Sequence, residues 1–254
     1  MRGMELADKV AIVPCAAVGA GRAIAERLAA AGAVVVVADI DRAGGEQTRY
    51  LIEAAGGRAA FVAADMRSDG DVAALIDTAV TRYGGLHILV NNAGGGAHPP
   101  ARFPAASAGQ WGSVLDANLR GAMLATQLAL EPMRRSGGGA VVNMGSTAGL
   151  GYAAHSWPEY AAAKAALIRF TACLAGLRET MNVRVNCVAP DWIGTDRAYR
   201  ELAAMTPTER AATPDPIPLS ELTDGVVELI RDDRLAGRIM VLLPHQPPRL
   251  MDAA

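Results

Sequence analysis

VAIVPCAAVGAG, the stretch from Val10 to Gly21, decides the fold class. It begins with a short β-branched run, Val10–Val13, and passes through a glycine-containing turn into Gly21–Ala31, an Ala/Leu/Arg/Glu-rich stretch with the apolar period of a helix. A second β-branched run, Val34–Val37, follows directly. A strand, a helix and another strand in this order are typical of a βαβ unit, in which the two strands lie parallel.

The same alternation of short apolar runs and helical stretches continues along the chain. Further strands are predicted at Ala59–Ala63, Ile88–Val90, Ala140–Met144, Val183–Val188 and Arg238–Leu243. Further helices are predicted at Asp71–Tyr83, Gln110–Met133, Tyr160–Arg178 and Leu219–Arg231. The pattern therefore indicates an α/β fold with a seven-stranded, mostly parallel sheet that helices cover on both faces.

Two segments near the C-terminus depart from this alternation. Thr206–Pro218 contains four prolines, so it cannot form a continuous helix or strand. We expect residues 196–218 to form an excursion that serves as a substrate lid, and residues 244–254 to form a C-terminal tail. Neither segment requires a second domain, and residues 1–254 are predicted to fold as one.

The composition narrows the class of function. The 254 residues include 24 basic and 26 acidic side chains, and a net charge of -2 gives no argument for a nucleic-acid partner. The apolar runs fall short of the roughly 20 residues that span a bilayer, so no membrane association is expected. Three scattered cysteines, Cys15, Cys173 and Cys187, favour neither a disulfide framework nor a metal site. These features favour a cytoplasmic protein.

The turn after the first predicted strand has the composition of a phosphate-binding turn. In open α/β sheets this turn offers the amide groups of a helix to a pyrophosphate, and Gly19, Ala20 and Gly21 allow the close backbone approach. Asp39 stands at the end of the second strand, where its carboxylate can accept hydrogen bonds from an adenosine ribose 2′-hydroxyl and repel a 2′-phosphate. The alternative is that Asp39 caps a helix or a turn.

Four further motifs, in order, complete a family pattern. They are Asn91-Asn92-Ala93-Gly94, Ser146, Tyr160-Ala161-Ala162-Ala163-Lys164 and Pro190-Asp191-Trp192-Ile193-Gly194-Thr195. From about Leu6 to Leu243 the chain resembles the short-chain dehydrogenase/reductase family. The resemblance implies a single, doubly wound Rossmann-type domain, a nicotinamide cofactor and alcohol–carbonyl redox chemistry.

The resemblance assigns the family's catalytic roles to Asn118, Ser146, Tyr160 and Lys164. Tyr160 and Lys164 are four residues apart on a predicted helix, so they share one face, and the ammonium is expected to favour the phenolate. Ser146 would hydrogen-bond the substrate oxygen, and Asn118 would hold a water that links the lysine to solvent. Hydride would pass between the substrate carbon and the nicotinamide while Tyr160 exchanges the hydroxyl proton.

The resemblance also implies the contacts to the cofactor. Asp65 and Met66 match the adenine site, Asn92 the contact beneath the cofactor, and Ile193 and Thr195 the contacts around the carboxamide. Tyr160 and Lys164 would also contact the nicotinamide ribose. No basic residue occupies Val18 or Ile40, where the family often places one for a 2′-phosphate, so NAD is expected rather than NADP.

Three positions depart from the family pattern. The turn normally begins Thr-Gly, but here it reads Pro14-Cys15, which removes an amide donor and places a non-glycine where a positive φ is customary. Cofactor binding could be weakened, and Cys15 could be a redox-sensitive thiol or simply a small side chain. Pro190 is followed by Asp191 instead of glycine, which favours a basic or polyhydroxylated substrate or merely caps a turn.

The substrate side is predicted to be mainly apolar and aromatic. Gly96, His155 and Trp192 are candidate substrate residues, although His155 could be a plain surface histidine. A secondary alcohol or ketone with hydrophobic surface is the expected substrate. The two long helices, Gln110–Met133 and Tyr160–Arg178, are expected to build a homodimer or homotetramer. Two alternatives stay open: a lyase or isomerase that uses the Tyr/Lys pair with bound NAD, and a non-catalytic nucleotide-binding regulator.

Overall fold

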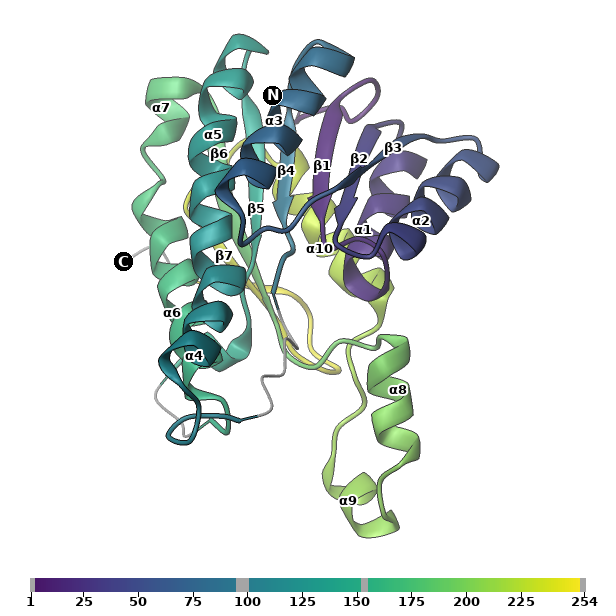
Figure 1. The fold of residues 1–254 in the computed structure, drawn as a ribbon, viewed down its shortest axis with the longest axis vertical. Coiled ribbons are helices and arrows are strands. Elements are labelled where there is room, and N and C mark those ends of the chain that lie inside the picture. The colour runs from purple at the N-terminus through teal and green to yellow at the C-terminus, as the bar shows by residue number, and fades with distance from the viewer. Residues whose placement is uncertain (1–2, 95–100, 152–154, 252–254) are drawn as a thin grey trace.

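A central sheet with helices on both faces organises the chain in a computed structural model, which describes residues 3–94, 101–151 and 155–251 (Figure 1). In the described residues the sheet has eight strands in the order β3-β2-β1-β4-β5-β6-β7-β8. All neighbouring strands are parallel except β7 and β8. The strands are β1 (Val10–Pro14), β2 (Val34–Asp39), β3 (Arg58–Ala63), β4 (Ile88–Asn91), β5 (Gly139–Met144), β6 (Val183–Pro190), β7 (Ile239–Leu242) and β8 (Arg249–Leu250).

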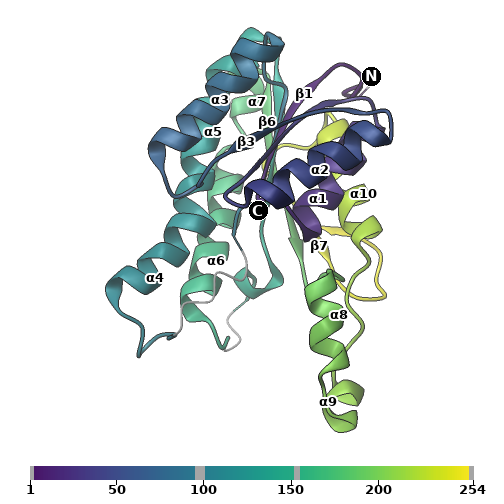
Figure 2. The ribbon, with the colours of Figure 1, turned by 45° about the vertical axis from the view of Figure 1, so that its right-hand side comes forward.

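The helices form two layers, one on each face of the sheet. Helices α1, α2 and α10 pack on one face, and α3, α5 and α7 on the other (Figures 1 and 2). The helices are α1 (Gly19–Ala30), α2 (Arg42–Ala54), α3 (Asp69–Tyr83), α4 (Ala108–Leu115), α5 (Gly121–Arg135), α6 (Pro158–Cys173), α7 (Leu177–Met181), α8 (Asp196–Ala203), α9 (Pro207–Ala212) and α10 (Leu219–Arg231). A π-helical turn, η1 (Asp116–Arg120), joins α4 to α5, and a 3₁₀ turn, η2 (Thr147–Gly149), follows β5.

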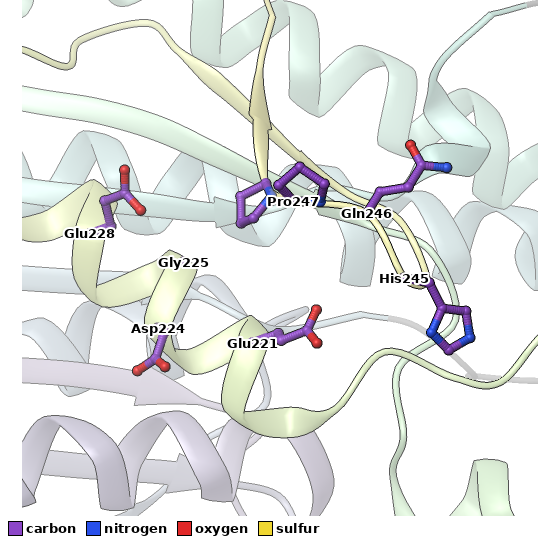
Figure 3. Close-up of a pocket in the computed structure, with 8 residues that line it drawn as sticks. Glu221, Asp224, Gly225, Glu228, His245, Gln246 and Pro247 are labelled. Carbon is purple, nitrogen blue, oxygen red and sulfur yellow. The ribbon is translucent and has the colours of Figure 1, made fainter.

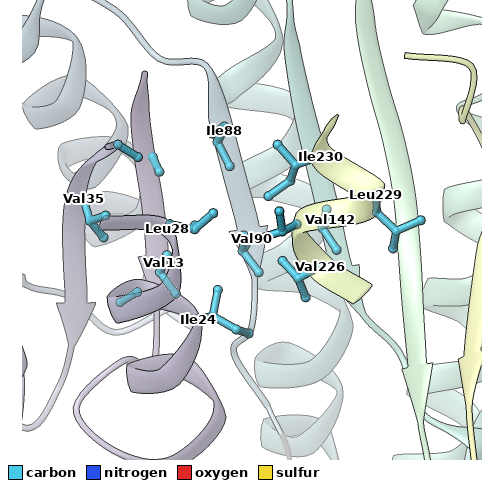
Figure 4. Packing of buried hydrophobic residues seen from close by; sticks show 14 of the residues in the cluster. Val13, Ile24, Leu28, Val35, Ile88, Val90, Val142, Val226, Leu229 and Ile230 are labelled. Carbon is cyan, nitrogen blue, oxygen red and sulfur yellow. The ribbon is translucent and has the colours of Figure 1, made fainter. Parts of the chain in front are cut away.

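The core explains why the β-branched runs become strands. Ile24 and Leu28 of α1 pack with Val226 of α10 against valines of β1, β2, β4 and β5 (Figure 4). All of β1 and β6 is buried, which is typical of parallel strands that helices cover on both sides. The predicted fold class is confirmed.

The main difference from the sequence prediction is an eighth strand. Arg249–Leu250, in the segment predicted to be a tail, pairs antiparallel with β7, so that Met240 faces Leu250 and Val241 faces Arg249. A short reversal can connect only antiparallel strands. In this reversal His245 adopts φ 58°, a left-handed conformation. Glycine is the usual residue in this conformation, and because this position is not a glycine the turn could not be recognised from the sequence.

Three helical segments also differ from the prediction. The helix predicted at Gln110–Met133 contains the π-helical turn η1, and the helix predicted at Tyr160–Arg178 breaks after Cys173. Helix α2 was not predicted, although Asp41 caps it by accepting a hydrogen bond from the amide of Gly44.

The segment predicted to be a lid is a pair of short helices held at its base. Ile193 bridges to Ile217, the amide of Gly194 donates to the Ile217 carbonyl at 2.8 Å, and the amide of Ile217 donates to the Trp192 carbonyl at 2.7 Å. Helices α8 and α9 project away from the layers beyond this base (Figure 2). Pro207 opens α9, where a missing amide costs nothing. Movement of this pair as a lid stays a prediction.

Candidate active site

The predicted site residues gather at the carboxyl ends of the parallel strands. The glycine turn follows β1, Asp39 ends β2, Asn92 follows β4, Ser146 follows β5 and Thr195 follows β6. Because these strands are parallel, all five positions lie at one edge of the sheet, which is where open α/β proteins bind their ligands.

The glycine turn has the geometry of a pyrophosphate cradle. Helix α1 begins at Gly19, and its N-cap residue, Val18, supplies no side-chain hydrogen bond to the first turn. A Cβ at Gly21 would lie 2.2 Å from the carbonyl oxygen of Cys15, and Gly19 has φ +61° with its Cβ position 3.4 Å from Thr195 Cγ2. Both positions favour glycine. The backbone is therefore open to an anion at the positive end of α1, and the residues present fit a dinucleotide cofactor.

Pro14 and Cys15 leave this turn intact. The Asn92 side-chain amide donates to the carbonyls of Pro14 and Cys15, both at 3.1 Å, so it joins the turn to the end of β4. The Cys15 sulfur accepts a hydrogen bond from the amide of Gly94. Cys15 adopts φ 51°, the left-handed region, which costs a non-glycine residue roughly 1 kcal/mol.

Cys15 is not a reactive thiol in this environment. Desolvation by the surrounding protein, and after it the charge of Asp39, raise the pKa of Cys15 to about 11, although the residue as a whole is exposed. A thiol with that pKa is almost entirely protonated at neutral pH, and the protonated form is a poor nucleophile. The structure therefore favours the small-side-chain alternative over the redox-sensitive one.

Asp39 takes the turn role, one of the two roles that the sequence left open. Its Oδ2 accepts from the amide of Ala17 and its Oδ1 from the amide of Asp41, both at 2.9 Å, so the carboxylate acts as a turn residue. Each oxygen keeps lone pairs for a ribose hydroxyl. Ile40 follows Asp39 directly, and Val18 follows Ala17, whose amide binds the Asp39 carboxylate. Val18 and Ile40 are 65% and 66% exposed, and neither offers a positive charge to a 2′-phosphate.

The residues predicted at the adenine site differ in character. Asp65 forms an ion pair with Arg67 at 2.7 Å, and the hydrogen bond from that guanidinium holds the pKa of Asp65 below its usual range. Met66 is buried in the core beneath α3 and α5. Ile193 lies in the bridge at the base of the lid segment, and Thr195 caps α8 by accepting from the amide of Ala198.

Ser146, Tyr160 and Lys164 come together beside β5. Ser146 caps the turn η2 and forms a hydrogen bond with the Tyr160 side chain. Helix α6 begins at Pro158. Because Tyr160 and Lys164 both lie in this helix, they are one helical turn apart. The Lys164 ammonium donates to the Met144 carbonyl at 2.7 Å and lies 5.6 Å from the centroid of the Tyr160 ring.

The titration behaviour of this trio corrects one expectation. Burial raises the pKa of Tyr160, and the Ser146 hydrogen bond and the charge of Arg197 oppose that rise. Lys164 was expected to lower this pKa, but it is not among the causes. Desolvation instead lowers the pKa of Lys164 itself to about 8, because the ammonium is fully buried. The proximity was predicted correctly, whereas the effect of burial was missed.

Asn118 lies in the π-helical turn η1. The side chain is 1% exposed, and its amide donates to the Val114 carbonyl at 3.0 Å. A Cβ at Gly94 would lie 2.2 Å from Asn118 Oδ1, so only glycine permits this approach of the loop after β4. Single π-helical turns are frequent at functional sites, because the extra residue redirects side chains.

The substrate side is framed by aromatic rings. The rings of His155 and Trp157 lie 6.1 Å and 6.2 Å from the ring of Tyr160, and His155 Nδ1 accepts from the Trp157 amide at 3.1 Å. Trp192 is half-buried at the base of the lid segment. Gly96, another predicted substrate residue, lies outside the described residues.

Sequence reasoning missed two charged residues on this side. The guanidinium of Arg102 stacks 4.4 Å from the centroid of the Trp157 ring, and Arg197 is close enough to Tyr160 to affect its pKa. Neither belongs to a motif, and only the fold brings them near the tyrosine.

A separate hollow of about 440 Å³ lies between α10 and the loop that leads to β8 (Figure 3). None of the predicted site residues lines it. Its lining residues are Glu221, Asp224, Gly225, Glu228, His245, Gln246, Pro247 and Pro248.

Comparison with known proteins identifies the family. The family model for short-chain dehydrogenases matches residues 9–205. The cis-4-hydroxycyclohexanecarboxylate dehydrogenase of Sinomonas cyclohexanicum is 36% identical over 222 residues, which are 85% of this chain and 88% of that protein. The chain therefore belongs to the short-chain dehydrogenase family, and it is an oxidoreductase that acts on CH–OH groups.

Solved structures agree with this assignment. A 7α-hydroxysteroid dehydrogenase complexed with NADH and 7-oxo glycochenodeoxycholic acid is 29% identical, with a TM-score of 0.84 and 94% of each chain covered. A hydroxysteroid dehydrogenase from Escherichia coli is also 29% identical, with a TM-score of 0.81 and coverage of 94% of this chain and 96% of that one. Across the described residues, none of the helices has the length and apolar character that a membrane crossing requires.

Proposed function

We propose that this protein interconverts a secondary alcohol and a ketone with NAD(H), and that Tyr160 exchanges the substrate proton. The observation that carries the proposal is the position of Tyr160. It shares a hydrogen bond with Ser146 and lies one helical turn from Lys164, at the sheet edge that also holds the glycine turn.

The residues divide the chemistry between them. The glycine turn and Asp39 would hold NAD(H), whose nicotinamide ring would supply the hydride acceptor or donor. In the direction of oxidation, Ser146 and the ionised form of Tyr160 would hold the hydroxyl of the alcohol, and the hydroxyl proton would pass to the phenolate oxygen as hydride passes from the carbon to the nicotinamide. In the direction of reduction, Tyr160 returns the proton to the oxygen of the ketone. Lys164 places a positive charge 5.6 Å from the centroid of the Tyr160 ring, and its ammonium and Asn118 would lead the proton away from the tyrosine toward solvent.

The preference for NAD rests on charge. Asp39 presents a carboxylate at the end of β2. The two exposed residues named above, Val18 in the glycine turn and Ile40 directly after Asp39, are uncharged. A 2′-phosphate would meet a negative charge with no compensating cation, whereas a ribose 2′-hydroxyl would find an acceptor. The glycine turn, the carboxylate of Asp39 and the base of the lid segment, which holds Ile193 and Thr195, together support binding of the whole dinucleotide.

The substrate is proposed to carry an apolar ring system. Trp157 and His155 place aromatic surface beside Tyr160, and a third aromatic residue, Trp192, lies half-buried at the base of the lid segment. Two of the similar proteins named above act on, or bind, ring compounds that bear a hydroxyl or oxo group, which supports the same class of substrate here.

A cytoplasmic homodimer or homotetramer is proposed as the working form. Trp111 of α4 and Met123 of α5 are 37% and 41% exposed, on the long helices that were expected to make the subunit contact. All three cysteines are free, as in a reducing compartment.

Replacement of Tyr160 tests the function. Tyr160→Phe removes only the hydroxyl, and we expect turnover of ring alcohols with NAD to fall by about 10² to 10⁴-fold while NADH affinity stays within about twofold. Tyr50→Phe, at an exposed tyrosine of α2, is the matched control. Turnover by Tyr160→Phe equal to that of the control would exclude Tyr160 as the proton donor.

A further inference from the structure

Two arginines from distant segments flank the aromatic substrate side. Arg102 precedes α4, and its guanidinium carbon lies 4.4 Å from the centroid of the Trp157 ring. Trp157 in turn meets the Tyr160 ring edge-on, with 6.2 Å between the centroids. Trp157 therefore contacts both the guanidinium of Arg102 and the ring of Tyr160.

Arg197 approaches from the lid segment. It lies in the first turn of α8, two residues after Thr195, whose Cγ2 lies 3.4 Å from the position that a Cβ at Gly19 would take. The positive charge of Arg197 acts on the Tyr160 hydroxyl and favours its ionised form. The ion pair of Arg197 with Glu201 is 3.4 Å long and both side chains are about half exposed, so this pair contributes little to stability.

The stacked geometry of Arg102 leaves its donors available. A guanidinium that lies over an aromatic face keeps its N–H groups at the rim of its plane, and the stacking limits the motion of the side chain. Among the ion pairs within the described parts of the chain, none involves Arg102. Its charge therefore has no acidic partner there, although acidic side chains outnumber basic ones in the whole chain.

We propose that Arg102 and Arg197 bind a carboxylate of the substrate, so that the alcohol or ketone handled by Tyr160 is a hydroxy or oxo acid. The proposal rests on the proposed function, because it places the reacting carbon at Tyr160. Planar guanidinium groups match carboxylates in charge and in shape, and such hydrogen bonds are roughly twice as strong as neutral ones. Binding the carboxylate away from the reacting carbon would orient the carbonyl toward Ser146 and Tyr160.

Two carboxylates oppose this binding. Asp191 is exposed at the end of β6, and Asp196 is exposed in the first turn of α8. Both would repel an anion, so the proposal predicts that Asp191→Asn strengthens binding of the acid and leaves a neutral substrate unaffected. Asp191 by itself favours a basic substrate, and binding of such a substrate would be weakened by Asp191→Asn.

Matched acid–amide pairs of ring ketones test the proposal, and 4-oxocyclohexanecarboxylate with its amide is the simplest pair. With NADH, we expect kcat/KM for the acid to exceed that for the amide by about tenfold or more. Arg102→Gln and Arg197→Gln should each remove most of this ratio, and Arg102→Lys should restore part of it, because the charge returns without the planar fork. Arg200→Gln, an exposed arginine one turn further along α8, is the matched control and should keep the ratio.

A binding measurement separates failure of this proposal from failure of the proposed function. Reduction of acid and amide with equal kcat/KM, in the wild type and in both glutamine variants, overturns the carboxylate site and leaves the oxidoreductase function in place. If neither ketone is reduced, calorimetric titration with cyclohexanecarboxylate and cyclohexanecarboxamide decides. Binding of the acid alone that Arg102→Gln abolishes supports the site, and equal or absent binding overturns it.

Discussion

On one side of Tyr160 the site is made of main chain, and on the other side it is made of side chains. At the glycine turn, the first backbone amides of α1 receive no side-chain cap, and Asp39 and Asn92 hold the turn by hydrogen bonds to its backbone. Around Trp157, contacts come from side chains such as Arg102 and Arg197, which the fold collects from segments far apart in the sequence.

This difference separates two tasks. A main-chain cradle depends on which positions can be glycine, and it binds what all dinucleotides share. A side-chain frame depends on individual charges and rings, so it can change with few substitutions and decides which alcohol or ketone enters. The predictions below test whether the two sides respond to mutation in these different ways.

Gly21→Ala is expected to have the largest effect on the main-chain side. The added Cβ would lie 2.2 Å from the Cys15 carbonyl oxygen and 2.5 Å from Asn92 Nδ2, so the turn must move. We expect NADH affinity to fall by about 100-fold or more, with a loss of about 1 to 3 kcal/mol in the free energy of unfolding. Calorimetric titration and urea denaturation measure the two effects.

Gly109→Ala is the control for this substitution, because a Cβ at Gly109 meets no atom within 4 Å. It should leave NADH affinity unchanged. Equal affinities for the two variants would show that the turn does not hold the cofactor by close backbone approach.

Lys164→Met tests the buried lysine beside Tyr160, where the main-chain side and the side-chain side of the site meet. The pKa of Lys164 is about 8 in the folded chain, below the ordinary 10.5, because burial disfavours the charge. Between these values the unfolded chain binds more protons than the folded chain, so the stability of the wild type rises with pH. At pH 7 the full cost of burial is present, and the variant should be more stable by up to about 3 kcal/mol.

The advantage of Lys164→Met should shrink as the pH rises from 8 toward 10. Urea denaturation of both proteins across this range measures it, and the same variant should lose most turnover. A stability difference that stays constant with pH would show that Lys164 is not desolvated as the fold indicates.

Asp39→Ala tests the charge of the cofactor side. Removal of the carboxylate takes away the ribose acceptor and the repulsion of a 2′-phosphate, so we expect the preference for NADH over NADPH to fall by about tenfold. Asp41→Ala, which removes the cap of α2 two residues away, should lower stability and keep the preference. The same preference in Asp39→Ala as in the wild type would mean that Asp39 serves only the turn.

Cys15→Gly should have the smallest effect. Cys15 adopts φ 51°, which glycine tolerates without strain, but glycine also loses more entropy on folding. We expect a change of less than about 1 kcal/mol in the free energy of unfolding and no loss of NADH affinity. A large loss of affinity would give the thiol a role that its raised pKa does not explain.

The main-chain side could be predicted from the sequence, because strand runs, glycine positions and helix spacing are local signals. The glycine turn and Asp39 were found in this way, whereas Tyr160 and Lys164 were assigned by the resemblance to the family, and their helical spacing agreed with it. The pairing of Arg249–Leu250 with β7 was missed, since a two-residue strand has no recognisable pattern. The raised pKa of Tyr160 and the stacking of Arg102 on Trp157 were missed because burial and long-range contacts exist only after folding.

Calorimetric titration of the wild-type protein with NADH and with NADPH tests the central claim most directly. The account predicts micromolar binding of NADH and binding of NADPH at least about tenfold weaker, because the glycine turn is open and Asp39 repels a 2′-phosphate. Tighter binding of NADPH, or binding of neither dinucleotide, would contradict it.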